Sequence, residues 1–394
     1  MKLLHSIYHF LWAFFANVFY GNPSHKLTVV GVTGTKGKST TVELLAAIFG
    51  AAGETTAFLS SVRMKIGGAV EINRTGNSMP GRGRLQKFLW RAASAGCRYA
   101  FIEVTSQGVV QHRHRFMEWD GGIFTNLAPE HIESHGSFEA YREAKLSFFR
   151  FLALSPKENK IAVVNADDSA ASLFVGAARG ARVMAVSAAK FSRELELTGE
   201  WITVPVNLEN AALATAYAEE KSISRGAIRK ALDAFQGVPG RMEYVRKKPF
   251  AVVVDYAHTP DSLSRLYEFL KKENQGRLIG VLGAAGGGRD TWKRPAMGRI
   301  AAQFCDVVIL TNEDPYDEDP GQILSEIESG IFNFQGSIFK ILDRREALQK
   351  AVSLAKPGDV VVATGKGSES AIRLARRKVI FWDESAELET ILRR

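Results

Sequence analysis

The fold of this chain is decided by the stretch Val29-Val30-Gly31-Val32-Thr33-Gly34-Thr35-Lys36-Gly37-Lys38-Ser39-Thr40-Thr41. An apolar strand leads into a glycine-rich turn, and apolar spacing that continues to Ile48 predicts a helix after the turn. Glycines let the backbone N–H groups of such a turn point at phosphate oxygens, and the helix N-terminus favours negative charge. The stretch therefore predicts a nucleotide-binding loop, with ATP as the nucleotide.

Two side chains of this loop carry its chemistry. Lys38 can place a positive charge at the β- and γ-phosphates, and the Ser39 hydroxyl can hold Mg²⁺. Val32 stands where the strict phosphate-loop spacing requires glycine, so the loop is a variant. A chance glycine turn is the alternative, and Gly-Lys-Ser between a strand and a helix disfavours it. The predicted nucleotide contacts are Gly34, Thr35, Lys36, Gly37, Lys38, Ser39 and Thr40.

Composition narrows the class of protein. The 394 residues are 46% hydrophobic and 24% charged, as in an ordinary globular protein with two or three domains. Two cysteines, Cys97 and Cys305, exclude a disulfide framework and a four-cysteine zinc site. The net charge of +9 suits anionic ligands or an anionic membrane surface. Without a long Lys/Arg block or a nucleic-acid-binding motif, no nucleic-acid partner is expected.

The segment from Leu3 to Tyr20 is apolar and aromatic, and its spacing predicts a helix that ends at the turn Gly21-Asn22-Pro23-Ser24. Three interpretations remain open. The helix could dock on the protein, lie at a membrane surface as an anchor, or serve as a spanning or signal segment.

From Leu27 onward, strands alternate with helices, which predicts an α/β fold with a largely parallel sheet covered on both faces. Glu103 and His131 follow predicted strands, at the sheet edge where ligands of such folds gather, beside the phosphate loop. Turn residues at 237–241 predict a boundary to a second, Rossmann-like α/β domain. The expected domains are an apolar helix at 1–25, an ATP-binding domain at 26–239 and a C-terminal domain at 240–394.

Further motifs follow one another in a characteristic order: Glu103-Val104-Thr105-Ser106-Gln107-Gly108, Gln111-His112-Arg113, Phe124-Thr125-Asn126-Leu127, Glu130-His131 to His135-Gly136, Glu143-Ala144-Lys145, Gly240-Arg241-Met242-Glu243, Asp255-Tyr256-Ala257-His258-Thr259-Pro260-Asp261, Lys293-Arg294-Pro295 and Gly365-Lys366-Gly367. With these motifs the chain resembles the Mur ligases, in particular their UDP-N-acetylmuramyl-tripeptide synthetase branch. The resemblance covers nearly everything from Leu27 to the end.

The resemblance implies an enzyme of peptidoglycan precursor synthesis, in cell-wall biogenesis, cell shape and division. It would form an amide bond with ATP: a muramyl-peptide carboxylate attacks the γ-phosphate, and the amine of an amino acid displaces phosphate from the acyl phosphate. The implied cofactors are ATP and Mg²⁺. The implied catalytic residues are Lys38, Glu103, His131 and Lys145, of which Glu103, His131 and Lys145 would hold metal together with Ser39.

Lys145 is the unusual member of this set. In the family the equivalent lysine is carbamylated by CO₂ and so becomes an anionic oxygen ligand, which requires a neutral, buried amine. The alternative is a solvated helix lysine.

Other roles are implied residue by residue. Asn210, Arg241 and Asp255 would contact the nucleotide, whereas Ser78, Thr105 and Arg113 would face the muramyl peptide. Arginine suits a carboxylate-rich peptide because its planar fork binds carboxylates in two places. The predicted amino-acid contacts are Asn312, Asp314 and Glu369.

Two departures from the family pattern stand out. About 25 residues precede the first strand, where the family has a UDP-binding domain of about a hundred residues, so we expect that domain to be lacking. The family's Asp-Asn-Pro-Arg reads Glu313-Asp314-Pro315-Tyr316, which removes the arginine that grips diaminopimelate. The acidic run that follows Asp314 favours lysine as the amino acid, with a solvated acidic loop as the alternative.

Several functional alternatives remain. The chain could be a folylpolyglutamate-synthase-like ligase, a ligase acting on a lipid-linked precursor, or a nucleotide-binding scaffold without catalysis. We expect a monomer in the cytoplasm, with Leu3 to Tyr20 available for peripheral contact at the inner membrane surface.

Overall fold

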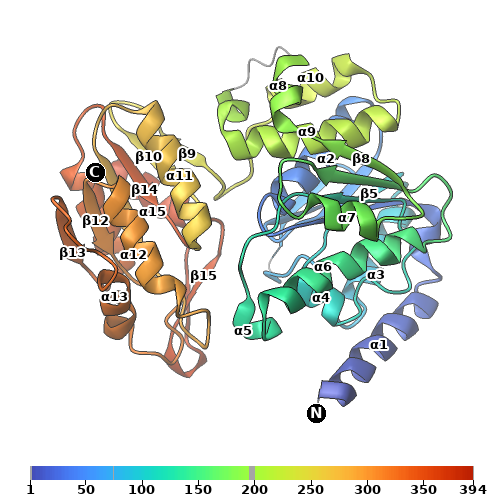
Figure 1. The fold of residues 1–394 in the computed structure, drawn as a ribbon, viewed down its shortest axis with the longest axis horizontal. Coiled ribbons are helices and arrows are strands. Elements are labelled where there is room, and N and C mark those ends of the chain that lie inside the picture. The colour runs from blue at the N-terminus through green and yellow to red at the C-terminus, as the bar shows by residue number, and fades with distance from the viewer. Residues whose placement is uncertain (1, 74, 195–199, 394) are drawn as a thin grey trace. The chain divides into compact units, whose positions relative to one another are not determined.

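The computed structural model describes residues 2–73, 75–194 and 200–393. The chain forms two compact units, and each is described by itself (Figure 1). Unit 1 holds the chain up to Pro129 and again from His135 to Gln236. Unit 2 holds Glu130–Ser134 and Gly237–Arg394. Both are mixed α/β with mostly parallel sheets, which confirms the predicted fold class.

Unit 1 is built on a sheet that has eight strands in the described residues, in the order β4-β3-β2-β5-β1-β6-β7-β8. Neighbours from β2 to β8 pair in parallel, whereas β3 and β4 add an antiparallel edge. The strands are β1 (Thr28–Thr33), β2 (Thr56–Leu59), β3 (Arg63–Ile66), β4 (Ala69–Ile72), β5 (Tyr99–Glu103), β6 (Gly121–Phe124), β7 (Ile161–Asn165) and β8 (Arg182–Val186).

The helices of unit 1 cover both faces of this sheet. They are α2 (Lys38–Ala51), α3 (Arg84–Ser94), α4 (Ser106–Val110), α5 (Ile132–His135, of which only His135 belongs to unit 1), α6 (Phe138–Ala153), α7 (Ala171–Ala177), α8 (Ala188–Glu194), α9 (Pro205–Glu220) and α10 (Arg225–Ala234), with short 3₁₀ turns η1 (Pro23–Lys26) and η2 (Glu200–Thr203). Alternate residues of one strand enter different cores: Val30 and Val32 join one cluster, and Val29 joins the other. Successive side chains point to opposite faces, and because both faces are buried the strand reads as a continuous apolar run.

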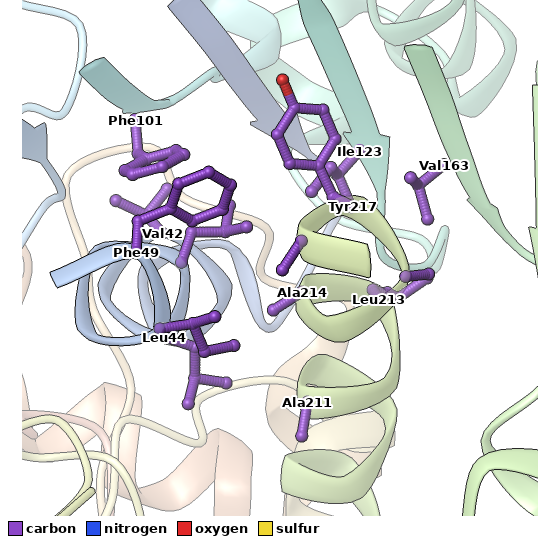
Figure 2. Close-up of a cluster of buried hydrophobic side chains, with 14 of the residues drawn as sticks. Val42, Leu44, Phe49, Phe101, Ile123, Val163, Ala211, Leu213, Ala214 and Tyr217 are labelled. Atoms are coloured by element: carbon purple, nitrogen blue, oxygen red, sulfur yellow. The ribbon is translucent and has the colours of Figure 1, made fainter. Parts of the chain in front are cut away.

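Helix α2, which begins in the phosphate loop, is anchored by an aromatic and aliphatic core. It packs against α9 and α10, and Figure 2 shows Val42 and Phe49 of α2 on the side of the cluster that faces Phe101 and Tyr217. The ring of Phe49 lies 4.4 Å from that of Tyr99 and 5.3 Å from that of Phe101. The loop is thus attached to a rigidly packed helix.

The predicted apolar helix is α1 (Lys2–Phe19), which belongs to unit 1. Phe10 and Phe14 meet the ring of Phe116 at 5.0 and 5.4 Å, and Ser6 Oγ lies 2.8 Å from His112 Nε2. The structure therefore shows a docked helix. Within the described part of the chain, no helix has the length and apolar character needed to cross a membrane.

Unit 2 is built on a six-stranded sheet in the order β13-β12-β11-β14-β10-β9, counted over described residues, in which only β9 is antiparallel to its neighbour. Its strands are β9 (Glu243–Arg246), β10 (Ala251–Val254), β11 (Leu278–Leu282), β12 (Val307–Leu310), β13 (Ser337–Lys340) and β14 (Val360–Ala363), beside a hairpin of β15 (Ala371–Arg373) and β16 (Val379–Phe381). Its helices are α11 (Pro260–Glu273), α12 (Lys293–Phe304), α13 (Pro320–Glu328), α14 (Arg344–Leu354) and α15 (Glu384–Leu392), with a 3₁₀ turn η3 (Ala375–Arg377).

Candidate active site

The phosphate loop joins β1 to α2, and two of its glycines are required by geometry. Gly34 and Gly37 have φ values of 149° and 82°, in a region that side chains rarely adopt. A Cβ on Gly34 would collide with Thr125 Oγ1, and one on Gly37 would collide with the amide of Asn210. The close approach of these side chains packs the loop tightly against β6 and α9.

Several polar contacts fix the loop conformation. Asn126 Oδ1 accepts from the Lys36 N–H at 2.8 Å, and Thr125 Oγ1 donates to the Lys36 carbonyl at 2.6 Å. The Lys38 ammonium donates to the carbonyls of Gly34 and Thr35 at 3.1 and 2.8 Å. Lys38 therefore curls back over the loop, with its ammonium on the loop's own carbonyls.

Glu103, at the end of β5, lies beside Ser39. Ser39 Oγ donates to Glu103 Oε2 at 2.8 Å, and the Ser61 N–H donates to the same oxygen at 2.8 Å. Both Glu103 and Ser39 are buried. Parallel β1 and β5 end at the same edge of the sheet, so their carboxyl ends bring the two oxygen donors together.

Lys145 lies on the buried face of α6, and only 1% of its surface is exposed. Its ammonium donates to the Gly34 carbonyl at 2.6 Å and lies 4.5 Å from the ring centroid of Tyr141. The solvated helix lysine that the sequence left open is therefore wrong. The structure brings Lys38 and Lys145 to the same carbonyl of the phosphate loop.

Asn210 on α9 also meets the loop. Its Oδ1 accepts from Thr41 Oγ1 at 3.2 Å, and the residue is 2% exposed. A predicted nucleotide contact from far along the chain thus lies against Gly37 at the start of α2.

His135 is a neighbour of this group that the sequence motifs included but assigned no role. Its Nε2 lies 3.1 Å from Ser106 Oγ, and its ring is 5.4 Å from that of Tyr141. Burial, and then the nearby charge of Lys145, lower the pKa of His135. The sequence did point to His135, because it lies in the Glu130-to-Gly136 motif, four residues after His131, the histidine to which a role was assigned.

His131 has a positive φ of 58° and an exposed side chain. It lies in the segment Glu130–Ser134, which clusters with unit 2, whereas the phosphate loop belongs to unit 1. Its neighbour Glu130 receives His258 Nε2 at 2.9 Å within unit 2. The assignment of His131 to the metal stays a prediction.

The residues predicted to face the acceptor lie together in unit 1. The Arg113 guanidinium donates to the Met79 carbonyl and to Gln111, and a Cβ on Gly81 would stand 3.3 Å from Arg113 Nε. Ser78 Oγ and Arg113 Nε are buried, and neither has a hydrogen-bond partner in the described structure. Thr105 Oγ1 accepts from the Gly108 N–H at 3.1 Å and caps α4. Unsatisfied buried polar atoms are costly unless a ligand meets them.

In unit 2, Arg241 and Asp255 occupy one corner at the start of the domain. The Arg241 guanidinium lies 4.2 Å from the ring centroid of Tyr256, and Asp255 accepts the N–H groups of Met242 and Ala257 at 2.7 Å each. Gly240 packs so closely on Gly367 and Ser368 that a Cβ would collide with their backbone. The Gly240-Arg241 and Gly365-Lys366-Gly367 motifs therefore meet in space.

A charged cluster surrounds Asp314. Lys366 Nζ donates to Asp314 at 2.9 Å and to Glu369 at 2.6 Å, and Arg373 binds the other oxygen of Asp314 at 2.9 Å. Tyr256 donates to Glu369 at 3.1 Å. Arg373, which is 40% exposed at its side chain, was missed from the sequence. Asn312, by contrast, offers its carbonyl to Arg344 at 2.9 Å.

The acidic run after Asp314 is partly engaged within unit 2, although Asp317 and Asp319 are exposed. Asp317 accepts from the Arg376 N–H at 2.8 Å, Glu318 pairs with Arg294 at 2.7 Å, and Asp319 caps α13. Asp314 and Glu318 are ion-paired, whereas Asp317 and Asp319 accept only backbone N–H groups and keep their negative charge, so the expectation of lysine stays a prediction.

The donor set at the loop is consistent with magnesium. In the described residues no group of three or more His, Cys, Asp or Glu side chains could hold a metal ion by itself. Magnesium needs no such cage, because it is commonly held by one or two carboxylates, water and substrate phosphates. Glu103 and Ser39, 2.8 Å apart, offer hard oxygen donors of this kind.

Comparison with known proteins assigns the chain to a family. Residues 32–218 match the Mur ligase middle domain, and residues 240–367 match the Mur ligase, glutamate ligase domain. The chain is 36% identical over 412 residues to a UDP-N-acetylmuramyl-tripeptide synthetase of Roseiflexus sp. (strain RS-1), covering 96% of the chain and 81% of that protein. It is 33% identical to a UDP-N-acetylmuramoyl-L-alanyl-D-glutamate–2,6-diaminopimelate ligase of Syntrophomonas wolfei subsp. wolfei (strain DSM 2245B / Goettingen), covering 97% of the chain and 81% of that protein.

Solved structures agree with this assignment. A 2,6-diaminopimelate ligase of the same kind superposes with a TM-score of 0.60 at 28% identity, over 93% of this chain and 78% of that one. A folylpolyglutamate synthase of Mycobacterium tuberculosis superposes with a TM-score of 0.69 at 18% identity, over 90% of this chain and 92% of that one. At that identity the second likeness shows a shared fold alone.

These matches define an ATP-dependent ligase fold with its phosphate loop, and the chain belongs to the Mur ligase family. It is an ATP-dependent acid–amino-acid ligase that adds an amino acid in peptidoglycan precursor synthesis, as the motifs predicted. The folylpolyglutamate-synthase-like alternative has only fold similarity behind it, and family membership is against the scaffold without catalysis.

Proposed function

We propose that the chain joins an amino acid to the free carboxylate of a muramyl-peptide acceptor. One observation carries the proposal: Lys38, Lys145, Glu103 and Ser39 surround one phosphate loop, with Lys38 and Lys145 on the same Gly34 carbonyl. A carboxylate oxygen bonds to the γ-phosphorus as ADP leaves. The amine nitrogen then bonds to the acyl carbon, and phosphate leaves with that oxygen. The amine loses one proton in the second step.

Within this scheme each residue has a definite task. Loop N–H groups and Lys38 bind the phosphates and offset the negative charge that both reactants bring. Ser39 and Glu103 would hold Mg²⁺, which neutralises phosphate charge when bound. We propose Lys145, as its carbamate, and His131 as further metal ligands. The burial of Lys145 supports its part, because carbamylation needs a neutral amine.

We assign the nucleotide and acceptor contacts as follows. Asn210 in unit 1, and Arg241 and Asp255 in unit 2, serve the nucleotide. Ser78, Thr105 and Arg113 serve the acceptor, and the unpartnered Ser78 Oγ and Arg113 Nε support this, since a peptide carboxylate would satisfy both.

For the amino acid we propose 2,6-diaminopimelate, with lysine as the competitor. Asp314 and Glu318 are ion-paired within unit 2, and the Arg373 side chain, which itself binds Asp314, is 40% exposed and lies 3.8 Å from Glu369. An arginine can bind the second carboxylate of diaminopimelate, and Glu369 can bind an amino group. Asn312 and Asp314 would then orient these two residues rather than carry charge to the ligand.

We further propose the domain division 1–25, 26–239 and 240–394, a monomer, and a cytoplasmic enzyme working at the inner membrane surface through Leu3 to Tyr20. The acceptor is either a soluble UDP-linked precursor or its lipid-linked counterpart. The docked position of α1, next to His112 and hence to Arg113, supports an acceptor met near that helix.

The proposal is tested by mass spectrometry of the product. Purified enzyme is incubated with ATP, Mg²⁺, a UDP-muramyl dipeptide or its lipid-linked form, and either diaminopimelate or lysine. We expect one amino acid to be added, with diaminopimelate preferred. The Arg373→Gln variant should lose that preference at least about 10-fold, the effect of one charge-assisted contact. Absence of an adduct with every acceptor and amino acid would overturn the proposal.

A further inference from the structure

Helix α1 presents its apolar side chains outward. Its inward side carries mostly polar or small residues, among them Ser6, His9, Ala16 and Asn17, together with Phe10. We call its outward apolar residues the outer face of α1; they are Leu4, Ile7, Tyr8, Leu11, Trp12, Phe15, Val18 and Phe19, with exposed fractions from 42% for Tyr8 to 80% for Phe19. A surface helix of a globular protein normally buries its apolar stripe and exposes its polar one. In α1, by contrast, most of the large apolar side chains are exposed.

The orientation of α1 is fixed by the contacts of its inward side. Ser6 Oγ bonds His112 Nε2 at 2.8 Å, Phe10 lies against Phe116, and a Cβ on Gly83 would meet Ala16 Cβ at 3.0 Å. A turn of the helix that buried its outer face would break all of these contacts. The apolar surface is therefore held exposed, and a patch of this size marks an interaction site.

The charge around the outer face is positive. No Asp, Glu, Lys or Arg occurs from Leu3 to Tyr20, and α3 packs beside α1. The exposed residues on α3, on the turn before it and next to Phe10 are largely basic; they include Arg82, Arg84, Lys87, Arg91 and Arg115. Glu118, which lines one hollow with Phe10 and Asn17 of α1, is engaged by Asn22 and His25 at 2.7 and 3.0 Å.

We propose that the outer face of α1 binds the surface of an anionic phospholipid bilayer. The helix would lie in the plane of the interface, with its aliphatic and phenyl side chains among the acyl chains and Tyr8 and Trp12 at headgroup level. Arg82, Arg84 and their basic neighbours would contact lipid phosphates. A second copy of the chain fits the outer face of α1 less well, because the basic residues beside α1 in the two copies would repel each other.

This proposal deepens the membrane location proposed above and rests on it, but it does not depend on ligase activity. It also gives the acceptor residues a place. His112, whose Nε2 lies 2.8 Å from Ser6 Oγ of α1, precedes Arg113 in the chain, so a bound bilayer would lie near the acceptor contacts. An acceptor confined to the membrane surface would then meet them at high effective concentration.

The test is flotation of the full chain with vesicles of phosphatidylcholine alone or mixed with phosphatidylglycerol, without ATP, acceptor or amino acid. We expect binding to the mixed vesicles that weakens at high salt, because lipid phosphates and basic side chains are screened. A failed ligase assay would leave this result unchanged.

Two matched variants locate the binding surface. The triple variant Leu11→Ser, Phe15→Ser, Phe19→Ser should bind mixed vesicles about 100-fold more weakly, since three large side chains leave the interface. The control Leu342→Ser, Phe332→Ser, Phe381→Ser makes the same chemical change at side chains of unit 2 that are 46%, 69% and 79% exposed, and it should bind like the unaltered protein. Unchanged thermal unfolding of both variants shows that each has folded.

The electrostatic part is tested by Arg82→Gln with Arg84→Gln, which should weaken binding to mixed vesicles about 10-fold or more. Three results would overturn the proposal: no vesicle binding at any composition, equal binding by the triple variant and its control, or self-association that the triple variant abolishes without any vesicle binding. The last result would make a second copy of the chain the occupant.

Discussion

At the scale of single residues, Lys145 shows how packing changes the meaning of a common side chain. Helix α6 buries Tyr141, Phe148, Phe149 and Leu152 on one face, and Lys145 lies on that same face at helical spacing. In the sequence, the burial of Lys145 was implied only by the family resemblance, and its spacing from these apolar residues agrees with that. Its hydrogen bond to the Gly34 carbonyl joins segments 111 residues apart, and no local sequence pattern predicts such a contact.

Lys38 provides the first prediction. Replacing it with methionine, which keeps the length of the side chain, removes the charge aimed at the phosphates. We expect kcat to fall at least about 100-fold, as for other preorganised charge contacts at a reacting group. Steady-state ADP release measures this, with Lys272→Met on exposed α11 as the control. A Lys38→Met enzyme that keeps most of its kcat would remove Lys38 from the mechanism.

His114 provides a prediction of pH dependence. It is buried, and burial, followed by the charges of Arg115 and His112, lowers its pKa from 6.5 to about 3. The folded state therefore holds it neutral, whereas the unfolded chain takes up a proton below pH 6.5. Its contribution to stability is complete above pH 6.5 and is lost as the pH falls toward 3, at about 1.4 kcal/mol per pH unit.

Urea unfolding of His114→Phe and of the unaltered protein between pH 7 and pH 4 measures the pH-dependent contribution of His114 to the unfolding free energy. The variant should show a shallower loss of unfolding free energy with acid, and the exposed-site control His5→Gln should not. If the unfolding free energies of His114→Phe and of the unaltered protein fell in parallel with pH, His114 would not be the source of the acid-dependent loss.

At the scale of elements, the strand–turn–helix unit was predictable because each part has a local cause. Apolar β1, positive-φ Gly34 and Gly37, and the apolar residues of α2 all lie within one short stretch. The β15–β16 hairpin and the pairing of Asp314 were not predictable. Lys366 and Arg373, the two partners of Asp314, lie more than 50 positions further along the chain and meet it only when the sheet of unit 2 has formed.

The packing of α2 supports a prediction about stability. Phe49 is fully buried among Tyr99, Phe101 and Tyr217. Phe49→Ala should lower the unfolding free energy by about 3–5 kcal/mol through lost burial and a residual cavity. Phe15→Ala on exposed α1 removes the same group from a position 60% exposed, and it should change stability by less than about 0.5 kcal/mol. Equal losses in the two variants would contradict the core that Figure 2 shows.

At the scale of the whole molecule, the sequence predicted an α/β chain with two larger domains and an apolar helix, and the structure shows two α/β units with α1 docked on the first. The helical spacing of α1 was visible, but its inverted orientation was not. Apolar residues follow almost the whole circumference of this helix, so the face that docks depends on Phe116 and His112, about a hundred residues away.

The central claim is that an acceptor carboxylate attacks the γ-phosphate. Its most direct test uses a muramyl dipeptide with ¹⁸O in the reacting carboxylate, together with ATP, Mg²⁺ and diaminopimelate. If an acyl phosphate forms, one carboxylate oxygen leaves with phosphorus, so mass spectrometry of the released phosphate should show one ¹⁸O atom in step with product formation. Phosphate that carries no ¹⁸O while the amide product accumulates would contradict the account.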